Sequence, residues 1–248
     1  MVHGVIFDCD GVLVNTEALV IGIEIAAMAG VGVTYERDAF IARYLGASEA
    51  DFEAGLNADH AAVHGRALPA GFFDQMKAQR YAHLERHIAA VPGAAEFAGR
   101  LRVPRAVASS SERQALAMKL KQTGLAGLFG DQVHSAEDVD RGKPAPDLYL
   151  HAAQALGVEP AMSLAIEDSA AGVRSAVAAG MTCWGFTGGG HCPPGHDAKL
   201  IATGAQAAFS TFDAMSAAYD EPVNTTSPWR SNTASASSTT PRSRPDTG

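Results

Sequence analysis

The chain has 248 residues, enough to bury a sizeable core as one large domain or two unequal ones. Hydrophobic residues make up 47% and charged residues 19%, an ordinary globular balance. The net charge of -8 argues against nucleic acid or an anionic membrane as a partner, because both are polyanions. A small phosphorylated metabolite remains compatible with this charge where a cation and a few placed donors bind it locally.

Cysteine usage and the N-terminal residues predict a cytoplasmic protein. The three cysteines are an odd number without the spacing of a disulfide framework, as is typical of a reducing compartment. The first strand-like run begins at Val2, which leaves no room for a signal peptide. The longest apolar run, Ala18–Val33, is short for a membrane span and contains Glu24, so it predicts a soluble helix that ends at Gly30.

The first predicted strand ends in two carboxylates. Residues 5–7 are Val, Ile and Phe, and Asp8, Asp10 and Gly11 follow closely. Because alternate residues of a strand point to opposite faces, the two acids can share a site only where the backbone turns, which Gly11 permits. The carboxyl end of a buried parallel strand is where open α/β sheets keep their active sites. An Asx-type turn after the strand is the alternative.

Residues 15–87 predict an all-helical insertion. Apolar residues recur there at helical spacing, and no convincing β-branched strand interrupts them. We expect four or five helices, with breaks near residues 30–32, Gly46, Asn57 and residues 68–69. An insertion of this kind directly after the first strand indicates a separate small cap domain.

From residue 88 onward, predicted strands and helices alternate. The expected strands are residues 104–108, 132–134, 163–166, 181–186 and 207–209. This pattern predicts βαβ units with right-handed crossovers, and hence an α/β fold with a doubly wound (Rossmann-like) parallel sheet between helices. The core domain should comprise residues 1–14 and 88–220, with residues 15–87 as the cap. Residues 221–248 are rich in Ser, Thr and Pro and predict a disordered tail.

Polar side chains gather where the predicted strands end. They are Asp8 and Asp10, Ser109, Lys143 in a loop, and Glu167 with Asp168. Because the carboxyl ends of parallel strands meet at one edge of a sheet, we expect these side chains to surround one phosphate-sized site. Carboxylate oxygens are the ligands that Mg2+ prefers, so the sequence predicts a magnesium site there.

Phosphoryl-transfer chemistry suggests a role for each group. Asp8 is placed to attack a phosphoryl group and form an acyl phosphate, which water then cleaves. Asp10 is suited to protonate the leaving oxygen and later to deprotonate the water. Lys143 would add positive charge, and Ser109 would donate to a phosphoryl oxygen. The expected magnesium ligands are Asp8, the Asp10 carbonyl, Glu167 and Asp168.

Four segments resemble the motifs of the haloacid dehalogenase superfamily of phosphatases and phosphomutases. They are residues 8–17, Ser109, residues 142–147 and residues 166–172, in the family's order and spacing. The resemblance covers roughly residues 2–218. It is greatest to the branch with a helical cap after the first motif, which contains β-phosphoglucomutases and sugar-phosphate phosphatases. The dehalogenases lack the second aspartate of the first motif, so Asp10 favours phosphoryl transfer.

Departures from that branch bear on the reaction. Asn15 replaces an aspartate that is usual in the branch, a position without direct contact to the reacting groups. The mutases also carry a cap histidine and a phosphate-gripping arginine, whereas those neighbourhoods here hold Leu19 and Val20, and Ser48 and Glu49. A mutase must hold and reorient a bisphosphate, so this loss favours a phosphatase. The alternatives are a β-phosphoglucomutase-like phosphosugar mutase and, from another class, a non-catalytic phosphometabolite-binding protein.

Further residues are candidates for binding. The candidates for contacting substrate are Glu17, Arg43, Ser110 and Ser111. Arg43 also has an interpretation as a surface cation, and Glu17 as a residue that complements a helix dipole. The histidine pairs His60–His64 and His83–His87, at i, i+4 spacing, are interpreted as solvated helix faces. Residues 188–196, with His191 and Cys192, are interpreted as a loop near the mouth of the site rather than a zinc site.

We therefore expect a cytoplasmic, Mg2+-dependent phosphatase that acts on a small phosphorylated sugar, polyol or sugar acid through an aspartyl-phosphate. The cap should close over substrate and exclude water during the first step. The sequence predicts neither the particular metabolite nor the oligomeric state.

Overall fold

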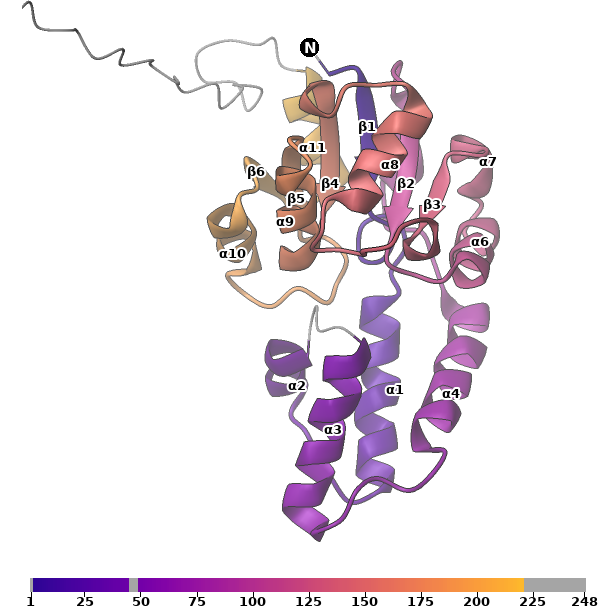
Figure 1. The fold of residues 1–248 in the computed structure, drawn as a ribbon, viewed down its shortest axis with the longest axis vertical. Helices are drawn as coiled ribbons and strands as arrows, with labels where there is room; N and C mark the ends of the chain where they lie inside the picture. Colours follow the sequence, from indigo (N-terminus) through magenta and orange to yellow (C-terminus); the bar gives the residue numbers. More distant parts are fainter. Residues whose placement is uncertain (1, 45–48, 221–248) are drawn as a thin grey trace, which may run out of the picture.

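The computed structural model describes residues 2–44 and 49–220. Within this part of the chain a six-stranded parallel sheet has the order β3-β2-β1-β4-β5-β6 (Figure 1). The strands are β1 (Gly4–Phe7), β2 (Arg105–Ser109), β3 (Val133–Ser135), β4 (Ser163–Glu167), β5 (Thr182–Phe186) and β6 (Ala207–Phe209). The chain proceeds outward from β1 to β3 and then returns to β4 on the other side. The predicted doubly wound sheet is thus confirmed, with its switch point between β1 and β4.

Side-chain alternation along β1 supplies a hydrophobic core on each face of the sheet. Val5 and Phe7 point into one core, and Ile6 points into the other. The first face is covered by α5 (Ala94–Arg100), α6 (Arg113–Gln122), α7 (Ala126–Phe129) and α11 (Phe212–Asp220). The second face is covered by α8 (Asp147–Leu156), α9 (Ala170–Ala178) and α10 (His196–Thr203). Short 3-10 helices, η1 (Ala136–Asp138) and η2 (Pro160–Met162), precede α8 and β4.

Four helices lie below the carboxyl edge of the sheet in Figure 1. They are α1 (Glu17–Gly30), α2 (Arg37–Tyr44), α3 (Glu49–His64) and α4 (Phe72–His87). These helices have a hydrophobic core of their own, which includes Met28, Phe40 and Leu56. We propose that residues 15–87 form the cap and that residues 1–14 and 88–220 form the core domain. The predicted helix break at Gly46 and the predicted tail, residues 221–248, lie outside the described residues.

Two expectations for the cap were wrong. The helix α3 continues through Asn57 rather than breaking there, since the Asn57 side chain accepts a hydrogen bond from the Leu68 backbone N–H at 3.2 Å. That tertiary partner removes the competition with the helix backbone that favours a break at asparagine. His60 is buried rather than solvated, and its Nδ1 lies 2.9 Å from the Arg66 carbonyl oxygen.

None of the described helices is long and apolar enough to cross a membrane.

The apolar helix α1 carries one buried acid. In α1, Glu24 is 6% exposed and its carboxylate lies 3.5 Å from the Arg80 guanidinium of α4. Burial raises the pKa of Glu24 from 4.5 to about 7, although Arg80 acts in the opposite direction. The ion pair therefore only partly offsets the cost of burying this charge.

This raised pKa predicts a pH dependence of stability. From pH 4.5 to about 7 the unfolded chain has released a proton that the folded protein retains at Glu24, so the free energy of unfolding falls as pH rises through this window. At about 1.4 kcal/mol for each pH unit by which a pKa moves, the loss amounts to about 3 kcal/mol. Glu24→Gln should remove this part of the pH dependence, as measured by urea unfolding at about pH 5 and about pH 8.

Glu85, which is exposed on the same helix as Arg80, provides the control substitution. Glu85→Gln should keep the wild-type difference in unfolding free energy between the two pH values. Parallel pH profiles for wild type and Glu24→Gln would contradict the raised pKa.

Candidate active site

The turn after β1 brings the first two acids to the switch point of the sheet. Asp8 directly follows the strand, and its backbone N–H donates to the Ile166 carbonyl of β4 at 2.9 Å. Gly11 has a φ of +79°, which L side chains rarely adopt. A Cβ atom on Gly11 would lie 1.9 Å from Asp168 Oδ2. Glycine at this position therefore permits both the turn and the approach of Asp168.

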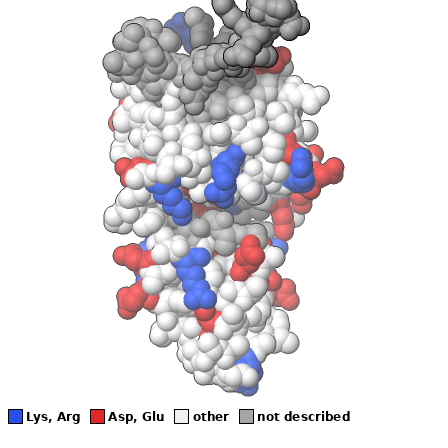
Figure 2. Space-filling view, turned by 60° about the vertical axis from the view of Figure 1, so that its left-hand side comes forward, with Lys and Arg blue, Asp and Glu red and all other residues white. Residues whose placement is uncertain are grey.

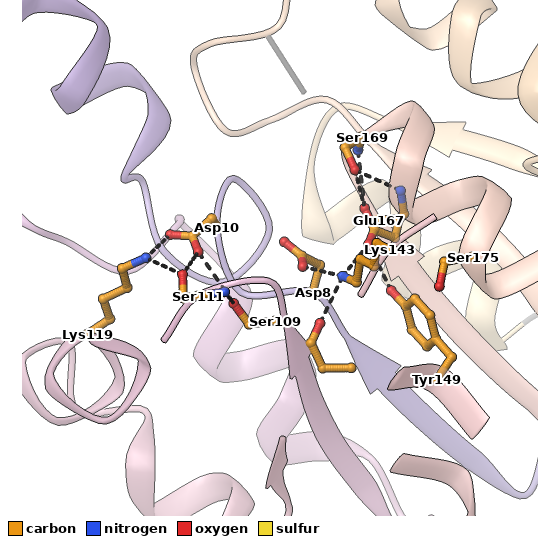
Figure 3. A network of polar contacts seen from close by, with 12 residues as sticks. Asp8, Asp10, Ser109, Ser111, Lys119, Lys143, Tyr149, Glu167, Ser169 and Ser175 are labelled. Carbon is orange, nitrogen blue, oxygen red and sulfur yellow. Dashed lines mark hydrogen bonds and ion pairs between the residues drawn. The ribbon is translucent and has the colours of Figure 1, made fainter. Parts of the chain in front are cut away.

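Lys143 lies at the centre of one polar cluster (Figure 3). Its Nζ lies 2.5 Å from both Asp8 Oδ1 and Glu167 Oε1, and it donates to the Ala108 carbonyl at 2.9 Å. The lysine side chain is buried, which disfavours its charge, but Asp8 and Glu167 raise the pKa of Lys143 above its ordinary value. We call Asp8, Lys143, Glu167 and Asp168 the Lys143 cluster.

Glu167 is held by several donors besides Lys143. Tyr149 donates its hydroxyl to Oε1 at 2.9 Å, and Ser169 donates both its backbone N–H and its hydroxyl to Oε2. The carboxylate lies against the first turn of α9, where a Cβ on Gly172 would be only 1.8–2.1 Å from its atoms. Glycine at 172 thus leaves space for a fully buried carboxylate at a helix N-terminus, where the dipole favours it.

Three carboxylates of the Lys143 cluster form a group that fits a hard divalent cation. One oxygen each of Asp8, Glu167 and Asp168 lies within 4.8 Å of the others, and all three residues are buried. Burial raises the pKa of Asp8 well above its ordinary value; the nearby acids act in the same direction and Lys143 opposes them. A bound divalent cation would relieve this repulsion, and an all-oxygen donor set suits Mg2+.

Asp10 belongs to a second polar cluster, on the opposite side of Asp8 in Figure 3. Its Oδ1 accepts hydrogen bonds from Thr16 Oγ1 and Lys119 Nζ, each at 2.5 Å. Its Oδ2 accepts from Ser111 Oγ at 2.8 Å and from Ser109 Oγ at 3.5 Å. Burial opposes ionisation, but the charge of Lys119 and the donated hydrogen bonds lower the pKa of Asp10 below its ordinary value.

Sequence reasoning missed Lys119. This residue lies on α6 and is buried, and its Nζ contacts both Asp10 and Ser111 Oγ. One signal was available, because the buried face of α6 comprises Ala115, Leu116, Lys119 and Leu120. A lysine that follows apolar residues by three and four positions lies on the same buried face of the helix as they do. Its charge needs an acidic partner there.

His191 is a second residue near the site whose contacts the sequence did not reveal. Its Nε2 lies 2.9 Å from Asp168 Oδ2, and His196 Nε2 lies 2.6 Å from the Asp168 carbonyl oxygen. Burial acts against the charged form, but the hydrogen bond to Asp168 raises the pKa of His191 to about 11. The loop also packs on the first turn, since a Cβ on Gly189 would lie 2.4 Å from the Gly11 carbonyl oxygen. These contacts place the loop against the carboxylates.

The zinc interpretation of that loop gains no support from its geometry. Cys192 Sγ lies 3.5 Å from His191 Nε2. Among residues 2–44 and 49–220, two groups of three side chains approach closely enough to hold a metal, and neither contains Cys192. His191 instead orients Asp168.

The predicted substrate-binding residues have different surroundings. Glu17 is half-buried at the start of α1, where burial and the charge of Asp10 raise its pKa above the ordinary value. Ser111 contacts Asp10, and Ser110 is exposed. Arg43 forms its described contacts within the cap, with Asp59 at 2.5 Å and over the Tyr44 ring at 5.3 Å. Substrate contacts by these residues stay predictions.

The clustered acids lie at the switch point of the parallel sheet, which makes this edge the candidate active site of an enzyme. A family model described as haloacid dehalogenase-like hydrolase matches residues 2–180, and the chain belongs to this family.

Three relatives show how far the similarity reaches. Protein SUPPRESSOR OF QUENCHING 1, chloroplastic, of Arabidopsis thaliana is 37% identical over 73% of this chain, but this chain spans only 17% of its length. Validoxylamine A 7'-phosphate phosphatase of Streptomyces hygroscopicus subsp. limoneus is 34% identical over 79% of this chain and 88% of its own. 6-phosphogluconate phosphatase of Escherichia coli is 24% identical over 78% of this chain and 86% of its own length.

Two solved structures share the architecture. A conserved haloacid dehalogenase-like protein of Agrobacterium tumefaciens is 32% identical, with a TM-score of 0.80 over 89% of this chain and 100% of its own. A HAD family hydrolase of Deinococcus radiodurans, solved with bound phosphate and sodium, is 36% identical. Its TM-score is 0.77 over 88% of this chain and 95% of its own.

The contacts of Lys119 predict that its ammonium group supports activity. Lys119→Met keeps an unbranched side chain but removes a charged hydrogen bond to Asp10. Such bonds contribute about 1.5–3 kcal/mol, so the rate of phosphate release should fall about 10- to 100-fold. Lys121→Met, an exposed position on the same helix, should leave the rate unchanged. Equal rates for the two variants, both checked for folding by circular dichroism, would contradict a role for Lys119.

Proposed function

We propose that this protein is a Mg2+-dependent phosphatase that hydrolyses a small phosphorylated sugar, polyol or sugar acid through a phosphorylated Asp8. The single observation that carries the proposal is the placement of Lys143, which lies 2.5 Å from both Asp8 and Glu167 in a buried set of acids. A carboxylate beside a fixed ammonium group and a cation site is suited to attack phosphorus.

Membership of the hydrolase family and the relatives support a phosphatase. Two relatives whose length this chain largely covers are named as phosphatases of 6-phosphogluconate and validoxylamine A 7'-phosphate. The former is a sugar acid phosphate, which supports the proposed substrate class. On the face shown in Figure 2, Lys and Arg side chains lie beside Asp and Glu side chains on both sides of the narrow region between the sheet above and the helices below. Because the surface charge there is mixed, we assign attraction of the anionic substrate to the buried Lys143 and the proposed cation rather than to this surface.

The nucleophile must act as a carboxylate, and its neighbours decide whether it does. Burial and the other acids favour the neutral form of Asp8, while Lys143 favours the charged form. When bound, Mg2+ would offset the repulsion between this carboxylate and the phosphate, with Asp8, Asp168, Glu167 and the Asp10 carbonyl as its proposed ligands. Asp8 then forms a bond to phosphorus as the bond to the leaving oxygen breaks.

Asp10 is proposed to carry the proton in both steps. It would give a proton to the leaving oxygen and later take one from the water that cleaves the aspartyl-phosphate. Thr16, Ser111 and Lys119 fix the orientation of its carboxyl group. Because Lys119 favours the ionised form, Asp10 takes up a proton from solvent before it can protonate the leaving oxygen, and the first step then leaves it as the carboxylate that the second step requires.

A cytoplasmic location is proposed from the cysteines. All three are free thiols in the structure, with Cys9 and Cys183 buried. Unpaired thiols are typical of a reducing compartment.

The nucleophile assignment predicts the behaviour of Asp8→Asn. The amide cannot form the acyl phosphate, so phosphate release should fall by on the order of 10³-fold or more. Wild-type protein quenched with acid during turnover should carry one extra phosphoryl mass on the peptide that contains Asp8, and the variant should not. Asp140→Asn, an exposed acid in the segment before Lys143, should retain both properties.

Three outcomes separate the alternatives. Full activity of Asp8→Asn would reject Asp8 as the nucleophile. Conversion of a hexose 1-phosphate to its 6-phosphate without net phosphate release would identify a mutase. Tight binding of phosphorylated metabolites without turnover across a broad panel would identify a binding protein.

Metal removal tests the cation separately. Treatment with EDTA should abolish phosphate release, because the three buried carboxylates would then repel an anionic substrate. Added Mg2+ should restore the rate, and NaCl at equal ionic strength should not. Full activity in excess EDTA would reject the proposed metal dependence while leaving the Asp8 assignment to its own test.

A further inference from the structure

A second group of potential metal ligands lies away from the Lys143 cluster. His134 of β3, Asp138 of η1 and His151 of α8 each offer one ligand atom, and these atoms all lie within 4.8 Å of one another. The edge strand β3 is separated from β1 by β2, which amounts to roughly 10 Å at about 4.8 Å per strand. Figure 1 shows α8 beside β3. This group, which we call the His134 cluster, is therefore distinct from the carboxylates at the switch point.

The His134 ring contributes a buried nitrogen that lacks a partner. The residue is 7% exposed, and its Nε2 has no hydrogen-bond partner among the described residues. Buried polar atoms in native proteins are nearly always paired, so this nitrogen is available to a ligand such as a metal ion. Burial, and to a smaller extent His151, lower the pKa of His134, which favours the neutral ring that metals bind.

Asp138 is held in place by two hydrogen-bond donors. Its Oδ2 accepts a hydrogen bond from the Ser135 backbone N–H at 2.7 Å, as part of a capping box. Its Oδ1 accepts from Arg113 Nη2 at 2.6 Å. Each carboxylate oxygen has two lone pairs, so both retain one for a metal. Second contacts of this kind commonly orient metal ligands.

His151 completes the group and leaves it open to solvent. Its ring lies edge-on to the His134 ring, with centroids 4.9 Å apart. His151 and Asp138 are partly exposed, so a metal ion has a path in and water can supply a fourth ligand. In a tetrahedral site with metal–ligand bonds of about 2.0–2.2 Å, ligand atoms lie roughly 3.4 Å apart. The ligand atoms of the His134 cluster are up to 4.8 Å apart, so metal binding would draw the three side chains together.

We propose that His134, Asp138 and His151 bind a divalent transition metal, of which Zn2+ is the best match. Two imidazoles with one carboxylate suit Zn2+, whereas Mg2+ prefers oxygen ligands alone. The site is not catalytic. Asp138 and His151 flank residues 139–146, the segment that carries Lys143, so a bound metal fastens that segment at both ends. Occupancy should therefore stabilise the protein and slow amide exchange in this segment.

Zinc titration of the full chain tests the site in the presence of millimolar Mg2+, which keeps the carboxylate site loaded. Calorimetry should show that His151→Gln binds one equivalent of Zn2+ fewer than wild type, or binds it at least about tenfold more weakly. Zn2+ should raise the melting temperature of wild type more than that of the variant. Electronic spectra with Co2+ should report a tetrahedral site with nitrogen ligands in wild type alone.

Matched variants exclude binding elsewhere and misfolding. His87→Gln alters the cap pair His83–His87, whose rings are 4.4 Å apart, and should bind as many equivalents as wild type. Asp138→Asn provides a second variant of the His134 cluster, and both should keep the metal-free circular dichroism spectrum of wild type. Equal stoichiometry and affinity in wild type and His151→Gln, or loss in His87→Gln instead, would overturn the proposal.

Discussion

The ammonium group of Lys143 is the contact on which the rest of the site depends. Asp8, Glu167 and Asp168 are buried close together, and buried like charges are costly unless a cation lies among them. Lys143 Nζ is placed 2.5 Å from two of these acids and is itself held by the Ala108 carbonyl of β2. One lysine thus connects β1, β2 and β4 at their carboxyl ends. The remaining excess of negative charge is what makes the site suitable for a divalent cation.

Two aspartates separated by one residue acquire opposite electrostatic properties. The pKa of Asp8 is raised, chiefly by burial among other acids, whereas the pKa of Asp10 is lowered by Lys119 and its hydrogen bonds. The turn at Gly11 directs the two side chains into different clusters, so one sequence motif supplies groups suited to different tasks. Environment rather than residue type would therefore divide the labour between the proposed nucleophile, Asp8, and the proposed proton carrier, Asp10.

The strand ends could be predicted from sequence because parallel strands place their carboxyl ends on one edge. That rule located Asp8, Asp10, Lys143 and the pair at Glu167 without any knowledge of distances. Contacts made by helices and loops far along the chain were not predictable in this way. Lys119 reaches Asp10 across 109 positions, and its only signal was a place on the buried face of α6. The partners of Asn57 and His60 likewise depend on tertiary packing within the cap, which periodicity does not reveal.

A few side-chain contacts of unequal strength connect the cap helices to the candidate active site. Lys77 of α4 pairs with Glu112 beside α6 at 3.0 Å, but both side chains are about half exposed. Exposed pairs contribute about 0.2–1 kcal/mol, so this contact can open at little cost. Thr16, directly before α1, instead donates to Asp10 at 2.5 Å from a buried position. A movement of α1 would therefore be transmitted to Asp10 more strongly than to Asp8, which contacts Lys143 at the edge of the sheet. Closure of the proposed cap would act on the proton transfer proposed for Asp10, with Asp8, the proposed nucleophile, already in place.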